Sequence, residues 1–255
     1  MDRVSFWEAG LMHRFYCPVS VSPGTIVSLS PEESYHALRV LRLEKGGSVE
    51  IIAASGRFSS VITDISENRI SVEILSLLPS SEPALSITLF QGLPKSGKME
   101  WIVQKAVELG VVRIIPVEMS RSVGRIRESD QHKKTDRLQK IAAEAAKQSG
   151  RSIIPAVNEP IRFKDIDNLL NDIGLLAVPW ENSSSYGPLA FKKEHPDIRS
   201  LGILIGPEGG ISFEEMNHLI NLNCVPMTLG PRIMRTETAG LAAVSSFLAI
   251  YGEME

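Results

Sequence analysis

The sequence predicts a two-part α/β protein: a small β-barrel at 13–79, followed by a larger domain of alternating strands and helices at 84–255. Short segments rich in β-branched residues, separated by turn residues, occupy the chain from about 24 to 78. The stretch 78–83 holds two prolines and two serines, the composition of a linker. Beyond it, apolar strand-like runs alternate with amphipathic helical segments, which is the pattern of an α/β domain.

The first domain contains four predicted strands and one predicted helix. The strands lie at 25–29, 48–53, 59–65 and 70–75, with turns at Gly46-Gly47, Ser55-Gly56 and Glu67-Asn68. Strands this short and this closely spaced predict a barrel. Residues 31–43 have a helical period, with Tyr35, Leu38 and Leu41 at helical steps. Residues 1–12 show no clear period and are expected to form a loose extension.

The second domain alternates strands with helices. Strands are expected at 86–90, 111–117, 173–178, 201–205 and 225–229. The runs at 173–178 and 201–205 are uninterrupted and apolar, which favours strands buried on both faces of a parallel sheet. Helices are expected at 99–109 before Gly110, at 136–149 between an N-cap at Thr135 and Gly150, and at 239–251. A further helix begins at the Ser212-Phe213-Glu214-Glu215 capping box and is expected to bury Phe213, Met216, Leu219 and Ile220.

Composition indicates a soluble, globular chain. Of its residues 43% are hydrophobic and 22% charged, and no apolar run is long enough for a membrane helix. No secretory signal is visible, and the two isolated cysteines, Cys17 and Cys224, favour a reducing compartment, the cytoplasm. The net charge is −3, but 91–151 carries 13 Lys and Arg against 7 Asp and Glu. That local charge of +6 is expected either to attract a phosphate backbone or to be an ordinary solvated surface.

One motif resembles a phosphate-binding loop without completing it. Gly92-Leu93-Pro94-Lys95-Ser96-Gly97-Lys98 follows a strand and opens a helix, but Met99 stands where such loops place a Ser or Thr for magnesium. Pro94 also removes one backbone N–H from the phosphate cradle. A basic turn that contacts RNA phosphates fits these residues better. The sequence has no GxGxxG, HExxH or GxSxG motif and no metal spacing among its histidines and cysteines, so no metal site is expected.

Two glycine-containing turns follow the last two predicted strands and are expected to lie side by side. The first is Gly206-Pro207-Glu208-Gly209-Gly210 and the second begins at Leu229-Gly230-Pro231-Arg232. Ligands of parallel sheets bind at the carboxyl ends of the strands, and glycines let a ligand approach the backbone closely. Taken alone, the first turn could equally be a simple strand–helix connection. The pair predicts a ligand site, with Leu229, Ile233 and Met234 as apolar walls.

The two turns together resemble the SPOUT methyltransferases of the RsmE type. The resemblance rests on 204–210 paired with Leu229-Gly230-Pro231-Arg232-Ile233-Met234-Arg235-Thr236-Glu237-Thr238-Ala239. Residues 92–110 resemble the family's first strand–helix unit, 144–151 its basic helix end, and 36–46 its N-terminal RNA-binding signature. The resemblance covers about 13–252.

This resemblance implies a fold that composition cannot show. It implies a PUA-like RNA-binding β-barrel followed by a SPOUT domain with a deep trefoil knot, an exception to the rule that chains do not thread loops. It also implies a homodimer, S-adenosylmethionine as cofactor, and methylation of N3 of one uridine in the 16S ribosomal RNA of the small ribosomal subunit. The expected cofactor-binding residues are Ile205, Gly206, Pro207, Gly209, Gly210, Leu229, Gly230, Ile233, Met234 and Thr238.

Three residues are the catalytic candidates. Uracil N3 is weakly nucleophilic until its proton leaves, and Arg232 or Arg235 could stabilise the anion near the uracil oxygens. Glu237 is a base or orienting group on one interpretation, and an acid that stabilises the first turn of a helix on another. Many relatives carry a polar pair such as His-Glu after the strand at 173–178. This chain has Pro179-Trp180-Glu181 there, so Glu181 is the residue of that loop that could face the cofactor.

RNA binding is expected of basic residues in both domains. Arg39 and Arg42 lie three apart on one predicted helix face, although exposed helices often carry such a pair. The full expected set is Arg14, Arg39, Arg42, Lys95, Arg121, Arg125 and Arg151. Two other functions stay open: a SPOUT methyltransferase for another RNA base, and a non-catalytic RNA-binding assembly factor. The pair of turns argues against the second, because a pure RNA binder has no use for a cofactor pocket.

Overall fold

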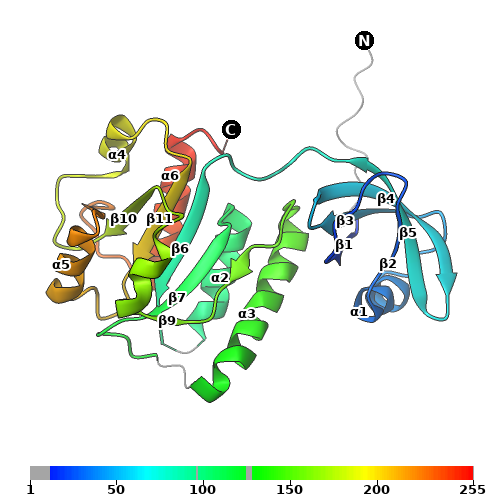
Figure 1. Cartoon of the computed structure of the whole chain (residues 1–255), viewed down its shortest axis with the longest axis horizontal. Helices are drawn as coiled ribbons and strands as arrows, with labels where there is room; N and C mark the ends of the chain where they lie inside the picture. Colours follow the sequence, from blue (N-terminus) through cyan, green and yellow to red (C-terminus); the bar gives the residue numbers. More distant parts are fainter. Residues whose placement is uncertain (1–11, 96, 125–127, 255) are drawn as a thin grey trace, which may run out of the picture. The chain divides into compact units, whose positions relative to one another are not determined.

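The computed structural model describes residues 12–95, 97–124 and 128–254. They divide into two compact units (Figure 1). One comprises the described chain up to Glu82 together with Ala146–Ile154, and the other comprises Pro83–Ala145 and Pro155–Glu255. The extension expected at 1–12 lies outside the described residues apart from Met12, and so does the RNA-binding candidate Arg125.

The smaller unit is a five-stranded sheet in the order β1-β3-β4-β5-β2. β1 runs parallel to β3, and the other neighbouring strands pair antiparallel. β1 and β2 are the two edges, so the described strands form a half-barrel, which agrees in part with the small barrel that the sequence predicts. The bounds are β1 Arg14–Cys17, β2 Ile26–Ser28, β3 Ser48–Ala53, β4 Gly56–Ser66 and β5 Arg69–Leu77.

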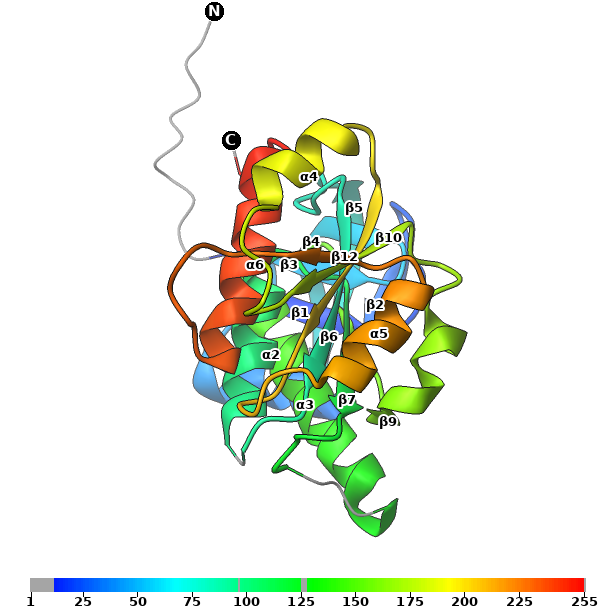
Figure 2. The same cartoon turned by 90° about the vertical axis from the view of Figure 1, so that its left-hand side faces the viewer.

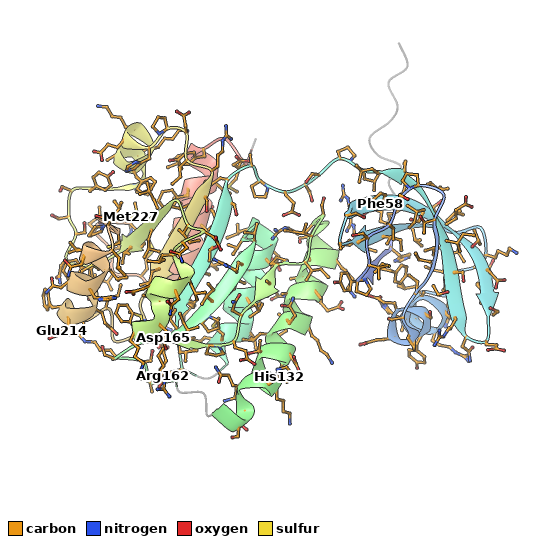
Figure 3. The ribbon with its side chains drawn as sticks, in the orientation of Figure 1. Phe58, His132, Arg162, Asp165, Glu214 and Met227 are labelled. Atoms are coloured by element: carbon orange, nitrogen blue, oxygen red, sulfur yellow. The ribbon has the colours of Figure 1, made fainter. Side chains whose placement is uncertain are left out.

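Alternating side chains build the core of this unit. Phe58 on β4 is 3% exposed and lies among the packed side chains of the sheet (Figure 3). Val72 on β5 is fully buried in the same cluster. The turn between these strands has positive φ at Glu67 (50°) and Asn68 (62°), the backbone of a two-residue hairpin whose twist matches that of the strands. The turn predicted at these two residues is confirmed.

The helix of the smaller unit is shorter than expected. α1 (Pro31–Tyr35) begins after Ser30, whose hydroxyl accepts the backbone N–H of Glu33, and continues as the π-helix η1 (His36–Val40). Arg42 then adopts a φ of 54°, in the left-handed region, which prevents the helical run from reaching residue 43. The prediction of a helix over 31–43 is therefore wrong at its C-terminal end.

Ala146–Ile154 belongs to the smaller unit, although the sequence placed it in the second domain. Polar contacts explain the grouping. The Glu82 carboxylate accepts hydrogen bonds from Arg151 Nε (2.9 Å) and from the backbone N–H of Ser152 (2.7 Å). Arg57 donates from Nη1 to the carbonyl of Gly150 at 2.8 Å. These bonds satisfy groups that would otherwise be unpaired where the chain leaves the helix.

The larger unit is a parallel sheet in the order β12-β10-β11-β6-β7-β8, with β9 beside β7. The central strands β6 and β11 are almost entirely buried, which explains their uninterrupted apolar sequences. The bounds are β6 Ser86–Gly92, β7 Arg113–Glu118, β8 Ala156–Val157, β9 Ile161–Arg162, β10 Leu175–Pro179, β11 Ser200–Ile205 and β12 Val225–Met227.

Helices cover both faces of this sheet. Figure 2 shows α6 and α5 on opposite sides of the strands. Met227, at the end of β12, is fully buried within the unit (Figure 3). The helix bounds are α2 Lys98–Leu109, α3 Glu128–Ser149, η2 Phe163–Leu169, α4 Pro188–Glu194, α5 Phe213–Asn221 and α6 Thr236–Ile250. Among the described residues, no helix has both the length and the apolar character needed to cross a membrane.

The helix predictions hold in part. The capping box of α5 is confirmed, and Gly110 ends α2 in the left-handed conformation. Phe213 and Ile220 are 60% and 47% exposed, however, so they do not face inward as expected. Thr135 is also not an N-cap, because α3 already begins at Glu128. The Glu, Gln and Lys residues before Thr135 are good helix formers and extend the helix past it.

Candidate functional site

A cavity of about 830 Å³ lies at the carboxyl edge of the larger unit's sheet. The strands are parallel, so the segments that follow β6, β10, β11 and β12 meet at this edge. The two glycine-containing turns follow β11 and β12, but these strands are not neighbours as the sequence suggested. β10 lies between them, and its C-terminal loop therefore also enters the cavity wall.

The turn after β11 brings its backbone close to the cavity. Gly210 has a φ of +73°, and its N–H donates to the carbonyl of Pro207 at 2.9 Å. A Cβ on Gly206 would lie 2.8 Å from Ile211 Cγ1 and 3.1 Å from the carbonyl carbon of Gly210. Only glycine fits these positions without rearranging the turn, so the cavity wall here is backbone.

The turn after β12 is held by the hydroxyl of Thr228, which accepts the N–H of Gly230 at 3.1 Å. Gly230 has a φ of +104° and open space where a Cβ would stand. Beyond it, Ile233 is 83% exposed, and Met234 also lines the cavity. This turn therefore combines accessible backbone with apolar side chains.

The loop after β10 supplies a third wall that the two-turn pattern did not reveal. Trp180 lines the cavity, and its backbone N–H donates to the carbonyl of Met227 at 2.9 Å. Its ring packs edge-on against Phe213, with centroids 5.6 Å apart. Among the described residues, the buried indole N–H of Trp180 has no hydrogen-bond partner. Glu181 also lines the cavity, with Oε1 2.7 Å from where a Cβ on Gly210 would stand, so the sequence correctly placed it at this site.

A buried chain of hydrogen bonds through Gln91 and Thr236 joins the turn after β11 to the start of α6, which follows the second turn. Gln91, at the end of β6, is fully buried and donates from Nε2 to the Thr236 hydroxyl at 2.9 Å. That hydroxyl in turn donates to the carbonyl of Gly206 at 2.6 Å. Thr236 is the first residue of α6, so the chain links β6, the turn after β11 and the helix that follows the second turn. Such a network fixes the geometry of the groups it satisfies.

An ionic contact joins the same segments at the cavity rim. Lys98 Nζ donates to Glu208 Oε1 at 3.1 Å and to Glu237 Oε2 at 3.0 Å. The hydrogen bond to Glu237, followed by that to Glu208, raises the pKa of Lys98 above its ordinary value. A hydrogen bond from its own backbone amide, with Lys98 adding to it, lowers the pKa of Glu237. Partial burial alone would raise the pKa of Glu208, but hydrogen bonds from its own backbone, Lys98 and the Lys95 amide lower it.

Most of the predicted cofactor-binding residues lie around the cavity. The nine that line it are Ile205, Gly206, Pro207, Gly209, Gly210, Leu229, Gly230, Ile233 and Met234. The tenth, Thr238, is exposed on α6 and is not part of the lining. Of the catalytic candidates, Arg232 and Arg235 are exposed and line the cavity. Glu237 does not line it and is paired with Lys98, a lysine that sequence analysis read only as part of a basic turn.

The turn that resembled a phosphate-binding loop is occupied by a carboxylate. The backbone N–H of Lys95 donates to both oxygens of Glu208, at 3.1 and 3.3 Å. A negative carboxylate therefore stands where a nucleotide phosphate would have to bind. Across the described residues, no group of His, Cys, Asp and Glu side chains could hold a metal ion.

The RNA-binding candidates divide into accessible and engaged residues. Arg39, Arg42 and Lys95 are exposed; Arg121 is exposed too, and donates to the carbonyl of Gly209 at 3.2 Å. Arg151, in contrast, is 3% exposed and bound to Glu82.

Arg14 is engaged as well, because its Nε donates to Glu50 at 2.7 Å and its Nη1 to the carbonyl of Lys147 at 3.1 Å. Both Arg14 and Arg151 are thus bound within the smaller unit. Arg151 is too buried to contact an RNA backbone as expected, whereas RNA binding by Arg14, whose side chain is 27% exposed, stays a prediction. The sequence shows that Arg14 and Arg151 are basic, but it does not show that Glu50 and Glu82 lie beside them in the fold.

Comparison with known proteins places the chain among RNA-modifying enzymes. The family described as "RNA methyltransferase domain" matches residues 81–248. The ribosomal RNA small subunit methyltransferase E of Bacillus subtilis is 32% identical over 92% of this chain and 95% of its own. That of Aquifex aeolicus is 30% identical over 92% of this chain and 98% of its own.

Solved structures agree. The ribosomal RNA small subunit methyltransferase E of Neisseria gonorrhoeae, bound to S-adenosyl methionine, is 30% identical with a TM-score of 0.81, covering 94% of this chain and 98% of the other. A putative methyltransferase of Legionella pneumophila in complex with the same molecule is also 30% identical, with a TM-score of 0.82 and the same coverage.

Proposed function

The chain belongs to the RNA methyltransferase domain family, with relatives named ribosomal RNA small subunit methyltransferase E, and we propose that it methylates N3 of a uridine in 16S ribosomal RNA. The methyl donor is S-adenosylmethionine. The observation that carries the proposal is the cavity at the carboxyl edge of the sheet. Both of its turns lie within the matched residues 81–248, and relatives of the same fold are bound to S-adenosylmethionine. The uridine N3 target rests on the combined motif resemblance.

The residues present fit this cofactor. Its adenosine part needs backbone donors and acceptors beside an apolar wall, and the cavity lining includes the glycine-containing backbone of 206–210 together with Leu229 and Met234. A volume of about 830 Å³ is in the range of small-molecule sites. When bound, the cofactor supplies a methyl group activated by a positively charged sulfur.

The chain's own residues prepare the uracil. N3 must give up its proton before it becomes a good nucleophile, and positive charge near the flanking carbonyl oxygens favours the anion. Arg232 and Arg235, which line the cavity and are exposed, provide that charge. Glu237 is held as an anion by Lys98 and its own backbone amide, and its lowered pKa disfavours proton abstraction. Glu237 therefore orients the segment that carries Arg235, and the N3 proton passes to solvent.

The proposal extends to the fold and the RNA. The smaller unit acts as a PUA-like RNA-binding domain, and the larger one as a SPOUT domain with a trefoil knot, in a cytoplasmic homodimer. N3 lies on the Watson–Crick edge, so a paired uridine must first be unpaired or flipped. The expected RNA contacts are the exposed Arg39, Arg42, Lys95 and Arg121.

Nucleoside analysis of 16S ribosomal RNA from a deletion strain tests the proposal. Deletion should remove one 3-methyluridine, and the wild-type gene should restore it. A gene with Gly206→Val, which places a branched side chain 2.8 Å from Ile211, should not restore it. Loss of a different methylated base would instead identify a SPOUT enzyme of another specificity. Unchanged methylation, with a defect in subunit assembly, would identify a non-catalytic assembly factor.

A further inference from the structure

Lys98 bridges two carboxylates that come from distant parts of the chain. It is the first residue of α2, after Gly97 in the left-handed conformation. Glu208 belongs to the turn after β11, and Glu237 to the first turn of α6. The two Nζ–O distances are 3.1 and 3.0 Å. All three side chains are at most 30% exposed, so they are partly shielded from water.

Each carboxylate is anchored to a different wall of the cavity. Glu208 sits in the middle of the Gly206–Gly210 turn and is also held by the Lys95 N–H. Glu237 is the second residue of α6 and directly follows Arg235, at the end of the second turn, and Thr236, both of which line the cavity. The ammonium of Lys98 therefore lies between the first wall and the end of the second.

Removing the Lys98 ammonium would replace electrostatic attraction between the two turns with repulsion. With Lys98 present, both anions are attracted to one cation. Without it, the two carboxylates that now share the Lys98 ammonium would keep their negative charges with no cation between them, and like charges that are partly desolvated repel. The hydrogen-bonded chain through Gln91 also links the same turns, but its groups carry no charge. Lys98 is thus the cation that lies between the two carboxylates at the rim.

We propose that Lys98 is a positioning residue: by bridging Glu208 and Glu237 it sets the spacing of the two turns that hold S-adenosylmethionine. This inference rests on the proposed function, because the ligand is the one assigned there. It differs from the expectation that this basic turn contacts RNA phosphates. A phosphate contact would affect RNA affinity, whereas a positioning role affects cofactor affinity in the absence of RNA.

Calorimetric titration of the RNA-free protein with S-adenosylmethionine and S-adenosylhomocysteine tests this role. Lys98→Met should weaken both affinities about tenfold, a typical coupling within one charged network. Lys98→Arg, which keeps the charge, should recover most of the loss. The matched control is Lys105→Met on the same helix, where the lysine pairs only with Glu108 one turn away in the described contacts; its affinity should equal that of the wild type.

A double variant separates electrostatics from other effects. Lys98→Met combined with Glu208→Gln removes the repulsion and should bind more tightly than Lys98→Met alone. Thermal melting of each variant identifies any that fails to fold, and Lys98→Gln then replaces Lys98→Met in the comparison. Wild-type affinity in Lys98→Met, or an effect seen only on RNA binding, would overturn the inference. A wild-type protein that binds neither ligand would instead refute the proposed function itself.

Discussion

Changing Glu82 to Gln tests the assignment of Arg151 to the interior of the smaller unit. The carboxylate accepts hydrogen bonds from Arg151 Nε and Nη2 and from the backbone N–H groups of Ser152 and Ile153, at 2.7 and 3.2 Å for the latter two. The side chains of Arg151 and Glu82 are 4% and 15% exposed. Glu82→Gln keeps the shape but leaves a buried guanidinium facing a neutral amide. Breaking a buried ion pair in this way costs about 3–5 kcal/mol.

We expect a loss of about 3 kcal/mol, the lower end of that range, because the amide oxygen of Gln can still accept hydrogen bonds. For a chain of this size such a loss lowers the melting temperature by roughly 6–12 °C. Urea denaturation followed by circular dichroism measures the change in the free energy of unfolding. Glu100→Gln is the control, because its partner Arg137 is 70% exposed and such pairs contribute about 0.2–1 kcal/mol. A loss below about 1 kcal/mol for Glu82→Gln, together with weaker RNA binding, would show that Arg151 serves RNA as the sequence suggested.

Three further predictions follow from the site and the surface. The pKa of Glu237 is lowered from its ordinary value of 4.5, so the stabilisation that Glu237 gives the ion pair is complete above pH 4.5 and is lost as the pH falls through the folded-state pKa. The pKa of Lys98 is raised from its ordinary value of 10.5, so the stabilisation that Lys98 gives is complete below pH 10.5 and is lost only above that pH. The ratio of the cofactor affinities of the wild type and Lys98→Met, measured by calorimetry, should therefore be constant between these limits, because titration of the ligand's own amino group affects both proteins equally; a step in that ratio near neutral pH would contradict the ion pair. Burial raises the pKa of the Cys224 thiol to about 11, so alkylation of this residue by iodoacetamide near pH 7 should be slow until the protein is unfolded; fast labelling of Cys224 in the folded protein, located by peptide mass spectrometry, would contradict its burial. Charge reversal at Arg39 and Arg42 should weaken RNA binding and reduce its dependence on salt while leaving cofactor affinity unchanged, and a loss of cofactor affinity would refute the division of labour.

The sequence predicts the two turns because the residues that determine their backbone conformation lie within the turns themselves. Glycines after an apolar strand, as at Gly206 and Gly230, report positive φ or close backbone approach without knowledge of the rest of the fold. The order of the strands is not local. β10 lies between β11 and β12 through long-range packing, so the contribution of Trp180 could not be derived from the spacing of the turns.

The pairing of charged side chains is also decided by contacts between residues that are far apart in the sequence. Lys98 and Glu237 are separated by 139 positions, and nothing in the sequence pairs them. The resemblance of 144–151 to a basic helix end predicts that Arg151 binds RNA, but the buried pairing of Arg151 with Glu82 overrides the usual exposure of basic residues. Composition identified the basic segment, but only the packed structure separates its engaged residues from its accessible ones.

Mass spectrometry of the reaction product tests the central claim most directly. Purified protein is incubated with S-adenosylmethionine and small ribosomal subunits from the deletion strain, and the 16S ribosomal RNA is then digested to nucleosides. The proposed function predicts one 3-methyluridine for each RNA molecule, dependent on both the protein and the cofactor. A methyl group on any other base, or no transfer to the subunits, would contradict it.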